Sequence, residues 1–258
     1  MAKAESVRYF CSACGASSAS WAGRCPSCGE WGSLEKGAAA SASGVSTPQK
    51  TKSVKATDVL PPERVSSGIE EFDRVIGGGW IPGGVFLLGG QPGIGKSTLL
   101  LQTCGSMAES IGSVLYVSGE ESASQIALRA RRLGVLSDEL HLVCTNDMAA
   151  ALESLPGKKF LVVDSVQAMR ADGEGGWPGS PAQVRAVAQM CISAAKEHSV
   201  PAVLVGHITK EGRIAGPMLL EHMVDGVLTF SGEDYSPYRM LRAGKTGSAV
   251  PRSLASSR

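Results

Sequence analysis

The sequence lacks three features that would each indicate a class of protein. No apolar run approaches the ~18–20 residues that a membrane-spanning helix needs. The N-terminal stretch MAKAESVRYF contains no apolar segment of the secretory type, so we expect no secretory signal. The formal net charge is only +1, which gives no global argument for nucleic-acid binding and leaves local basic patches as the alternative.

Charged residues make up 19% of the chain and hydrophobic residues 43%, which fits a soluble globular protein of one or two domains. The seven cysteines are unevenly placed, because four lie within residues 11–28. The others, Cys104, Cys144 and Cys191, stand singly in apolar segments, where a free cysteine behaves as a small hydrophobe. This distribution indicates a reducing cytoplasm and one metal site.

Three regions differ in composition. Residues 8–34 are dense in cysteine, glycine and tryptophan. Residues 35–57 contain no large apolar residue except valine, so they cannot offset their ordering entropy and are expected to form a flexible linker. From residue 58 to residue 245, short apolar runs such as GGVFLLGG and KFLVVDS alternate with helical segments such as ESASQIALRARRLG. This alternation predicts an α/β domain with a mostly parallel sheet covered on both faces.

Four cysteines form two Cys-x2-Cys pairs separated by ten residues: Cys11, Cys14, Cys25 and Cys28. Zn²⁺ prefers four such ligands in a tetrahedron, and each pair presents two thiolates to one ion. A segment of this size cannot form a stable core alone, so the metal would supply its folding free energy. Two disulfides or a redox dithiol are the alternatives, which a cytosolic setting disfavours. Ribbons of this kind bind nucleic acid or protein, or stiffen a terminus.

The stretch GQPGIGKST satisfies G-x-x-x-x-G-K-[ST] and stands between a predicted strand and a predicted helix. Its backbone N–H groups and the helix dipole favour a phosphate at this turn. We expect Lys96 to reach the β/γ-phosphates and the Ser97 hydroxyl to ligate Mg²⁺. A glycine-rich turn with an incidental lysine is the alternative. The predicted ATP-binding residues are Gly90, Gln91, Pro92, Gly93, Ile94, Gly95, Lys96, Ser97 and Thr98.

Carboxylates follow two other predicted strands. Asp164 ends KKFLVVDS, the Walker B pattern, which places a carboxylate beside magnesium. Glu120 and Glu121 follow the strand LYVS, and we favour Glu120 as the base that orients the attacking water. One of these two glutamates is expected to be merely solvated or near a helix start. His207 ends a further strand, where it either senses the γ-phosphate or is structural.

Several strings together resemble one family: RCPSCGEWGSL, RVSSGIEEFDRVIGGGWIPGGVFLLGGQPGIGKSTLL, YVSGEES, VVDSVQAM and VGHITKEG. They are similar to RadA (also called Sms), the bacterial recombination and DNA-repair ATPase family of the RecA superfamily. The resemblance extends from about residue 8 to Lys245. It implies a RecA-like P-loop domain after a zinc ribbon, with Zn²⁺, Mg²⁺ and ATP as cofactors. It also implies that Glu120 is the catalytic glutamate and that His207 couples the γ-phosphate to the DNA-binding loops.

The family further implies a homo-hexameric ring that binds single-stranded and branched DNA, uses ATP for branch migration, and works with a recombinase of the RecA type. The segment MRADGEGGWPGSPAQVR resembles its first DNA-binding loop and TKEGRIAGPMLLEHMVD the second. Their basic residues suit contacts to phosphates, but are equally compatible with exposed loops. These residues are Arg170, Arg185, Lys210 and Arg213.

The end of the chain departs from this resemblance. RadA-like sequences continue with a K-N-R-F-G motif and a Lon-protease-like domain, whereas here TGSAV follows Lys245. One codon choice for residues 246–258, read after adding a single A, gives NRFGSTSELGVFE. We therefore expect these residues to be an out-of-frame tail, with a genuine short tail as the alternative. Without the motif's arginine and the C-terminal domain, the chain is expected to bind Zn²⁺ and ATP but to hydrolyse weakly and assemble poorly.

Two other functions are weighed against a DNA-dependent ATPase. A RecA-fold signalling or clock-type ATPase that binds protein and not DNA shares strings such as SSGIEEFDRVIGGGWIPGG. The zinc ribbon, and a response of ATP turnover to single-stranded DNA, would separate the two. A replicative helicase of the DnaB kind is disfavoured, because no helical N-terminal domain precedes the P-loop region.

Overall fold

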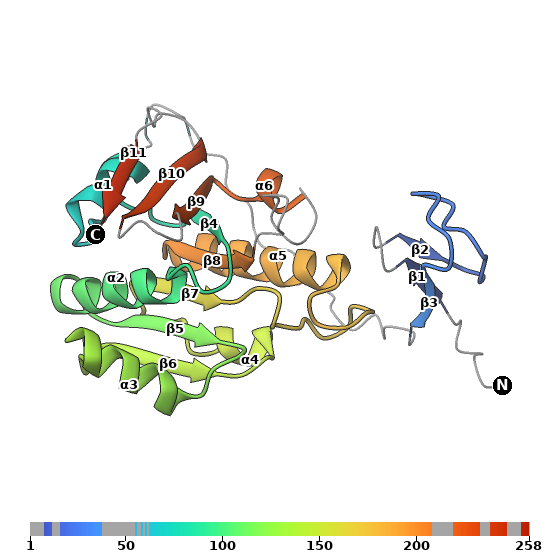
Figure 1. Ribbon diagram of the computed structural model, residues 1–258, viewed down its shortest axis with the longest axis horizontal. Helices are drawn as coiled ribbons and strands as arrows, with labels where there is room; N and C mark the ends of the chain where they lie inside the picture. Colours follow the sequence, from blue (N-terminus) through green and yellow to red (C-terminus); the bar gives the residue numbers. More distant parts are fainter. Residues whose placement is uncertain are drawn as a thin grey trace.

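The computed structural model describes residues 8–11, 16–37, 55, 58, 60, 62–207, 219–232, 238–246 and 254–257. These residues form a small N-terminal sheet and a larger α/β body (Figure 1). Within these ranges, no helix combines the length and the apolarity that crossing a bilayer would demand. The two bodies correspond to the cysteine-rich region and to the α/β region that the sequence predicts.

The small body is an antiparallel sheet in which the first strand is central and pairs with the other two. Its strands are β1 (Arg8–Cys11), β2 (Ser17–Ser18) and β3 (Leu34–Gly37). Its core contains only Cys11, Cys25 and Leu34 among the buried side chains that the structure describes. The last strand continues to Gly37, so the structured ribbon extends beyond the expected boundary at residue 34. Most of the expected linker lies outside the described residues.

The large body is built on a sheet in which eight strands are described, in the order β11-β10-β9-β4-β8-β7-β5-β6. The strands from β9 to β6 in this order are parallel, and β10 and β11 are antiparallel additions at one edge. β4 lies between β8 and β9 and pairs in parallel with both. The strands are β4 (Val85–Gly90), β5 (Val114–Ser118), β6 (Leu140–Cys144), β7 (Phe160–Asp164), β8 (Ala202–His207), β9 (Gly226–Gly232), β10 (Arg239–Thr246) and β11 (Leu254–Ser257).

Helices cover both faces of this sheet, because successive strand residues point to opposite sides. In β4, Leu87 belongs to one apolar cluster with α4, α5 and α6, whereas Leu88 belongs to a second cluster with α1, α2 and α3. Every residue of β4 and β5 is buried, as expected for strands with both faces covered. The helices are α1 (Glu70–Ile76), α2 (Lys96–Ser110), α3 (Ala123–Leu133), α4 (Met148–Leu152), α5 (Pro181–His198) and α6 (Leu219–Met223).

Local sequence signals fix the ends of the helices. The side chain of Ser122 caps α3 by accepting the backbone N–H of Gln125, whose side chain in turn accepts the N–H of Ser122. α3 ends at Gly134, which adopts a left-handed φ of 72°. Pro181 begins α5, where its missing N–H leaves no intrahelical partner unsatisfied. These signals place the turns that precede α3 and α5 next to the carboxyl ends of the parallel strands.

The prediction of an α/β domain with a mostly parallel sheet is confirmed. Residues 246–258, the expected out-of-frame tail, contain a described strand. β11 lies in this stretch and pairs antiparallel with β10, from Arg242↔Leu254 to Arg239↔Ser257. The parallel strands end at one edge of the sheet, which therefore brings together the segments that follow β4, β5, β7 and β8.

Candidate nucleotide site and metal centre

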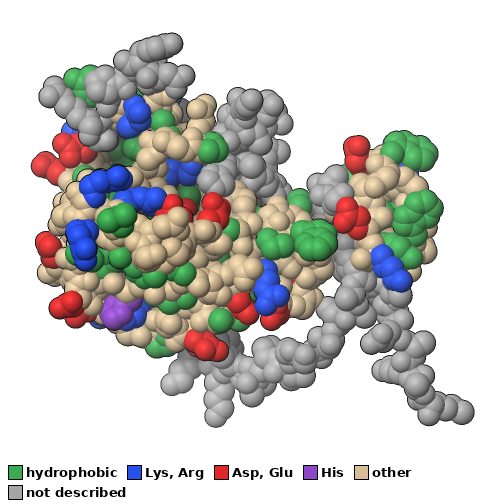
Figure 2. Space-filling view, turned by 60° about the horizontal axis from the view of Figure 1, so that its bottom comes forward, with side chains coloured by type: hydrophobic (Ala, Val, Ile, Leu, Met, Phe, Trp, Pro, Cys, Tyr) green, Lys and Arg blue, Asp and Glu red, His purple; other side chains and the backbone are tan. Residues whose placement is uncertain are grey.

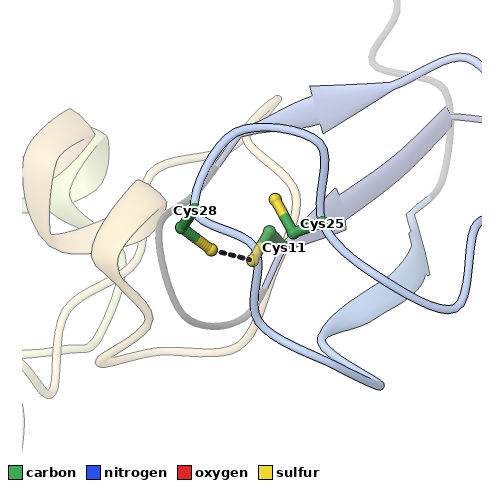
Figure 3. A group of neighbouring side chains, drawn as sticks. All are labelled: Cys11, Cys25 and Cys28. Carbon is green, nitrogen blue, oxygen red and sulfur yellow. Dashed lines mark hydrogen bonds between the residues drawn. The ribbon is translucent and has the colours of Figure 1, made fainter.

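Three of the predicted zinc ligands converge in the small body (Figure 3). The thiol sulfurs of Cys11, Cys25 and Cys28 all lie within 4.8 Å of one another, and those of Cys11 and Cys28 are 3.6 Å apart. A disulfide needs about 2.05 Å between sulfurs, whereas a tetrahedral ion with Zn–S bonds of about 2.3 Å holds its sulfurs about 3.8 Å apart. The three thiols therefore fit a metal ion. Cys14, the fourth predicted ligand, lies outside the described residues.

The backbone around these thiols favours the charged form that a metal requires. A backbone hydrogen bond from Cys28 lowers the pKa of the Cys25 thiol, against the effect of burial. The N–H of Ser27 adds to this at 3.4 Å from the sulfur. Gly29 closes the turn with a left-handed φ of 79° and donates its N–H to the carbonyl of Cys25 at 2.9 Å. The turn around the second cysteine pair is thus formed by its own backbone.

The predicted phosphate loop connects β4 to α2, as the motif requires. Gly93 and Gly95 adopt left-handed φ values of 78° and 111°, which a residue with a Cβ rarely takes. At Gly90 a Cβ would lie 2.6 Å from the carbonyl oxygen of Phe230 on β9, so only glycine fits without a shift. Gln91, Pro92 and Gly93 are exposed, which leaves the outer side of the loop accessible.

Lys96 is held inside this loop. Its Nζ donates to the carbonyl of Gly90 at 2.7 Å and to that of Gln91 at 3.0 Å, and the residue is only 5% exposed. Burial lowers the pKa of the Lys96 ammonium, while the charges of Asp164 and Glu120 act in the opposite direction. The cation therefore lies close to both predicted carboxylates, although they come from different strands. Ser97 and Thr98, the remaining hydroxyl residues of the motif, are half-buried at the start of α2.

Asp164 ends β7 on the side of the sheet that α2 covers. Its Oδ2 accepts a hydrogen bond of 2.6 Å from the hydroxyl of Tyr116, a residue of β5 that is 1% exposed. Burial raises the pKa of the Tyr116 phenol well above its ordinary value, and the Asp164 carboxylate adds to the rise. Sequence reasoning missed Tyr116, because an apolar strand such as VLYVS gives no sign of what its tyrosine hydroxyl contacts.

The two candidate glutamates have different partners. The carboxylate of Glu121 forms an ion pair with Arg129 of α3 through contacts of 2.6 and 2.8 Å. Glu120 instead accepts a hydrogen bond of 2.6 Å from the hydroxyl of Ser165, the residue after Asp164. The oxygen of Ser118 accepts the backbone N–H of Glu121 at 3.0 Å and fixes the turn itself. The arrangement leaves Glu121 engaged with a helix and places Glu120 on the side of Lys96 and Asp164.

His207 is the last residue of β8, and its backbone pairs in register with Gly90 at the start of the phosphate loop. The side chain of His207 lies outside what the structure describes, so its sensing role stays a prediction. Lys210 and Arg213 are also outside the described residues. For Lys245 the structure gives only the backbone, within β10.

The two described basic candidates for DNA contacts differ in surroundings. Arg170 is about half exposed and forms ion pairs with Asp147 at 3.5 Å and Asp172 at 3.4 Å. Arg185 is an exposed residue of α5. On the face shown in Figure 2, Lys and Arg side chains are interspersed with Asp and Glu and do not form one continuous basic surface among the described residues. A role in DNA binding for either arginine remains a prediction.

The loop between Arg170 and Arg185 is held by hydrogen bonds from its backbone to a buried glutamine. The Gln183 side chain accepts the N–H of Ala171 at 2.7 Å and donates to the carbonyls of Ala171 at 3.2 Å and Glu174 at 2.7 Å. Trp177 lies in the middle of the loop and is 78% exposed. Two further tryptophans, Trp21 and Trp31, are exposed on the small body, where Figure 2 shows hydrophobic side chains at the surface.

Comparisons with known proteins agree with the description of the small body as a metal-binding ribbon and of the large body as a nucleotide-binding domain. The family profile described as an AAA domain matches residues 49–213, and the profile described as a rubredoxin metal binding domain matches residues 9–36. The chain is 43% identical to the DNA repair protein RadA of Bacillus subtilis (strain 168) over 257 aligned positions, which cover 95% of this chain and 56% of the relative. The chain belongs to the RadA/Sms family of AAA-domain proteins.

Other RadA proteins give similar values. The DNA repair protein RadA of Brucella abortus (strain 2308) is 43% identical, with 95% of this chain and 56% of the relative covered. The chain therefore spans about half the length of the curated RadA proteins it matches. The match to a metal-binding profile, together with the Cys11–Cys25–Cys28 cluster, supports zinc in the small body.

Solved structures agree on the RecA-like fold of the large body. A DnaB-like replicative helicase, solved in a study of its interactions with primase, superimposes with a TM-score of 0.61 at 14% identity, covering 74% of this chain and 58% of that chain. The RadB recombinase superimposes with a TM-score of 0.57 at 22% identity, covering 75% and 94%. The predicted fold class, a RecA-like domain preceded by a zinc ribbon, is thus confirmed for this RadA-family chain.

Proposed function

We propose that the protein is a cytoplasmic ATPase of DNA repair and recombination that hydrolyses ATP with Mg²⁺ and responds to single-stranded DNA. One observation carries the proposal: the loop that holds Lys96 and the carboxylates of Asp164 and Glu120 follow parallel strands at the same edge of the sheet. There Ser165, next to Asp164, donates to Glu120 at 2.6 Å. A cation for phosphate, a carboxylate for a metal and a carboxylate for water are the parts that phosphoryl transfer to water requires. The likeness to RadA proteins of DNA repair supports the biological setting.

Each residue would have one task in this reaction. The backbone N–H groups of residues 90–95 and Lys96 would hold the phosphates, so Lys96 would exchange the carbonyls of Gly90 and Gln91 for phosphate oxygens. Ser97 and Asp164 would hold Mg²⁺, which when bound neutralises charge that develops on the phosphoryl oxygens. The Glu120 carboxylate would accept a proton from the attacking water. His207 would sense the γ-phosphate at the adjacent strand.

We further propose that single-stranded and branched DNA are bound by the segments that follow β7 and β8. Arg170, Arg185, Lys210 and Arg213 are the proposed phosphate contacts. Branch migration, a homo-hexameric ring and a recombinase of the RecA type as partner are proposed from the RadA family alone. Because the chain spans about half of its relatives, these properties of whole RadA proteins are not assumed to be complete in this chain.

The second candidate function is a RecA-fold ATPase that binds protein and not DNA. The mixed charge of the face in Figure 2 is compatible with it. The zinc ribbon favours the DNA-repair proposal. A metal-binding ribbon and an AAA domain match the same chain, and the resemblance to RadA implies this combination.

ATP hydrolysis by the full chain, measured with and without single-stranded DNA, tests the proposal. We expect weak, Mg²⁺-dependent turnover that rises on addition of DNA, and no nucleotide binding by Lys96→Ala. An ATP hydrolysis rate that does not change on addition of single-stranded DNA would favour the protein-binding alternative. A chain that does not bind ATP, or that binds it equally well after Lys96→Ala, would contradict the proposal altogether.

A further inference from the structure

The Tyr116 hydroxyl is buried against Asp164, one of the two residues of the proposed magnesium site. Tyr116 lies on β5, which pairs with β7 so that Tyr116 is opposite Val162 and Ser118 is opposite Asp164. The phenol therefore extends along the sheet toward the end of the neighbouring strand, where it donates to Asp164 Oδ2 at 2.6 Å. On the α2 side the Ser97 side chain is near enough to the phenol to act on its pKa, in the lowering direction. The hydroxyl is thus hydrogen-bonded directly to the Walker B carboxylate, with the phosphate-loop serine nearby.

Packing in the apolar core does not explain why residue 116 is a tyrosine and not a phenylalanine. Tyr116 packs in the cluster that lies under α2, in which the neighbouring aromatic residue on β7 is Phe160. A phenylalanine would bury the same ring without having to satisfy a hydroxyl, since a buried polar group costs free energy unless it is paired. The hydroxyl is paired because the Asp164 carboxylate accepts its hydrogen bond. The hydroxyl therefore contacts a carboxylate whose orientation matters for a metal.

We propose that Tyr116 is a positioning residue for the divalent metal of the bound nucleotide, an inference that rests on the proposed ATP site. Its hydrogen bond of 2.6 Å holds the Asp164 carboxylate in one orientation. Carboxylate ligands of metals are oriented by such hydrogen-bond partners, whose loss typically weakens metal affinity by roughly 10–100-fold. Tyr116 would act through Asp164 and would not itself hold the metal.

The test is the Mg²⁺ dependence of nucleotide binding by the full chain, followed with a fluorescent ATP analogue. In Tyr116→Phe the ring and its packing are kept and only the hydroxyl is lost. We expect the Mg²⁺ concentration at half-saturation to rise about 10–100-fold, while binding of the analogue in EDTA is unchanged. The matched control is Tyr238→Phe, which removes the hydroxyl of an exposed tyrosine distant in sequence from the site and is expected to behave as the unmodified chain.

A second measurement leaves Tyr116 in place. The chain contains four tyrosines, so a variant with Tyr9, Tyr235 and Tyr238 replaced by phenylalanine retains only Tyr116. Labelled with 3-fluorotyrosine, it gives a single ¹⁹F resonance, which we expect to shift when Mg²⁺ is added to the ATP complex and not when Mg²⁺ is added alone. This readout holds even if Tyr116→Phe does not fold.

The possible outcomes distinguish failure of the role of Tyr116 from failure of the proposed ATP site. A chain that binds the analogue with the same Mg²⁺ dependence after Tyr116→Phe, or a resonance that Mg²⁺ leaves in place, overturns the role of Tyr116 while the ATP site stands. A chain that binds no nucleotide under any condition overturns the ATP site and the inference together. The coupling between Tyr116 and Asp164 is checked in the Asp164→Asn variant. Adding Tyr116→Phe to it should have little further effect on the Mg²⁺ concentration at half-saturation.

Discussion

The two adjacent glutamates after β5 give the sharpest prediction for single residues. Glu120→Gln removes the proposed proton acceptor, so we expect turnover to fall by roughly 10²–10⁴-fold with ATP affinity retained. Glu121→Gln breaks the ion pair with Arg129, whose partners are 23% and 34% exposed, and should lower the free energy of unfolding by about 1 kcal/mol or less. Steady-state ATPase kinetics and thermal melts of both variants compare the two effects. A larger loss of turnover in Glu121→Gln would reverse the assignment.

Sequence motifs predicted the residues of this site that are close in sequence and could not predict those that are close only in space. The spacing of glycines around Lys96 is local, and so is the position of Asp164 at the end of an apolar run. The contacts of Tyr116 with Asp164 and of Ser165 with Glu120 join residues that are 48 and 45 positions apart. They depend on the order of strands in the sheet, which no local pattern specifies.

Among the elements, the turn that carries Glu120 is packed directly against the segment after β7. A Cβ on Gly119 would lie 2.8 Å from the Cβ of Ala168 and 3.0 Å from the Sδ of Met169. Gly119→Ala is therefore expected to lower the free energy of unfolding by about 1–3 kcal/mol and to reduce turnover by displacing Glu120. Chemical denaturation and ATPase rates measure both effects.

The matched control is Gly244→Ala on β10, where the added Cβ would meet the nearest atom, the Val227 carbonyl oxygen, at 3.7 Å. This distance is ordinary van der Waals contact, so we expect a change in stability within about 0.5 kcal/mol. Equal effects of the two substitutions would show that the close packing at Gly119 is unimportant.

The helices and parallel strands of the large body were predictable because hydrophobic periodicity and capping residues agree locally, as at Ser122 and Pro181. The antiparallel strand β11 was not, since Leu254–Ser257 is a short stretch with a single large apolar residue. Its pairing depends on the exposed edge that β10 offers, which is a property of the assembled sheet. The extension of β3 to Gly37 has the same cause, because β1 supplies the partner.

For the whole molecule, the separate cores of the two bodies predict separate responses to metal removal. The small core contains Cys11, Cys25 and Leu34, and none of these belongs to the clusters described in the large body. We expect about one zinc ion per chain, released by a thiol-modifying reagent and absent in Cys25→Ser. Nucleotide binding in EDTA should persist in Cys25→Ser.

A colorimetric zinc assay and the fluorescent ATP analogue measure these two properties. Cys144→Ser, which alters an exposed cysteine of the large body, is the matched control and should keep its zinc. Metal-free protein that no longer binds nucleotide would contradict the independence of the two bodies. Full zinc content in Cys25→Ser would contradict the ligand set.

The central position of β4 limits how the molecule can respond to ATP. A strand bonded along both sides to β8 and β9 cannot slide or tilt without rupturing two ladders at once. Its amides should be among the slowest in the chain to exchange with deuterated solvent. We therefore expect β4 to stay in place beneath the phosphates. Any movement that nucleotide turnover produces must then occur in the connecting segments beyond the strand ends.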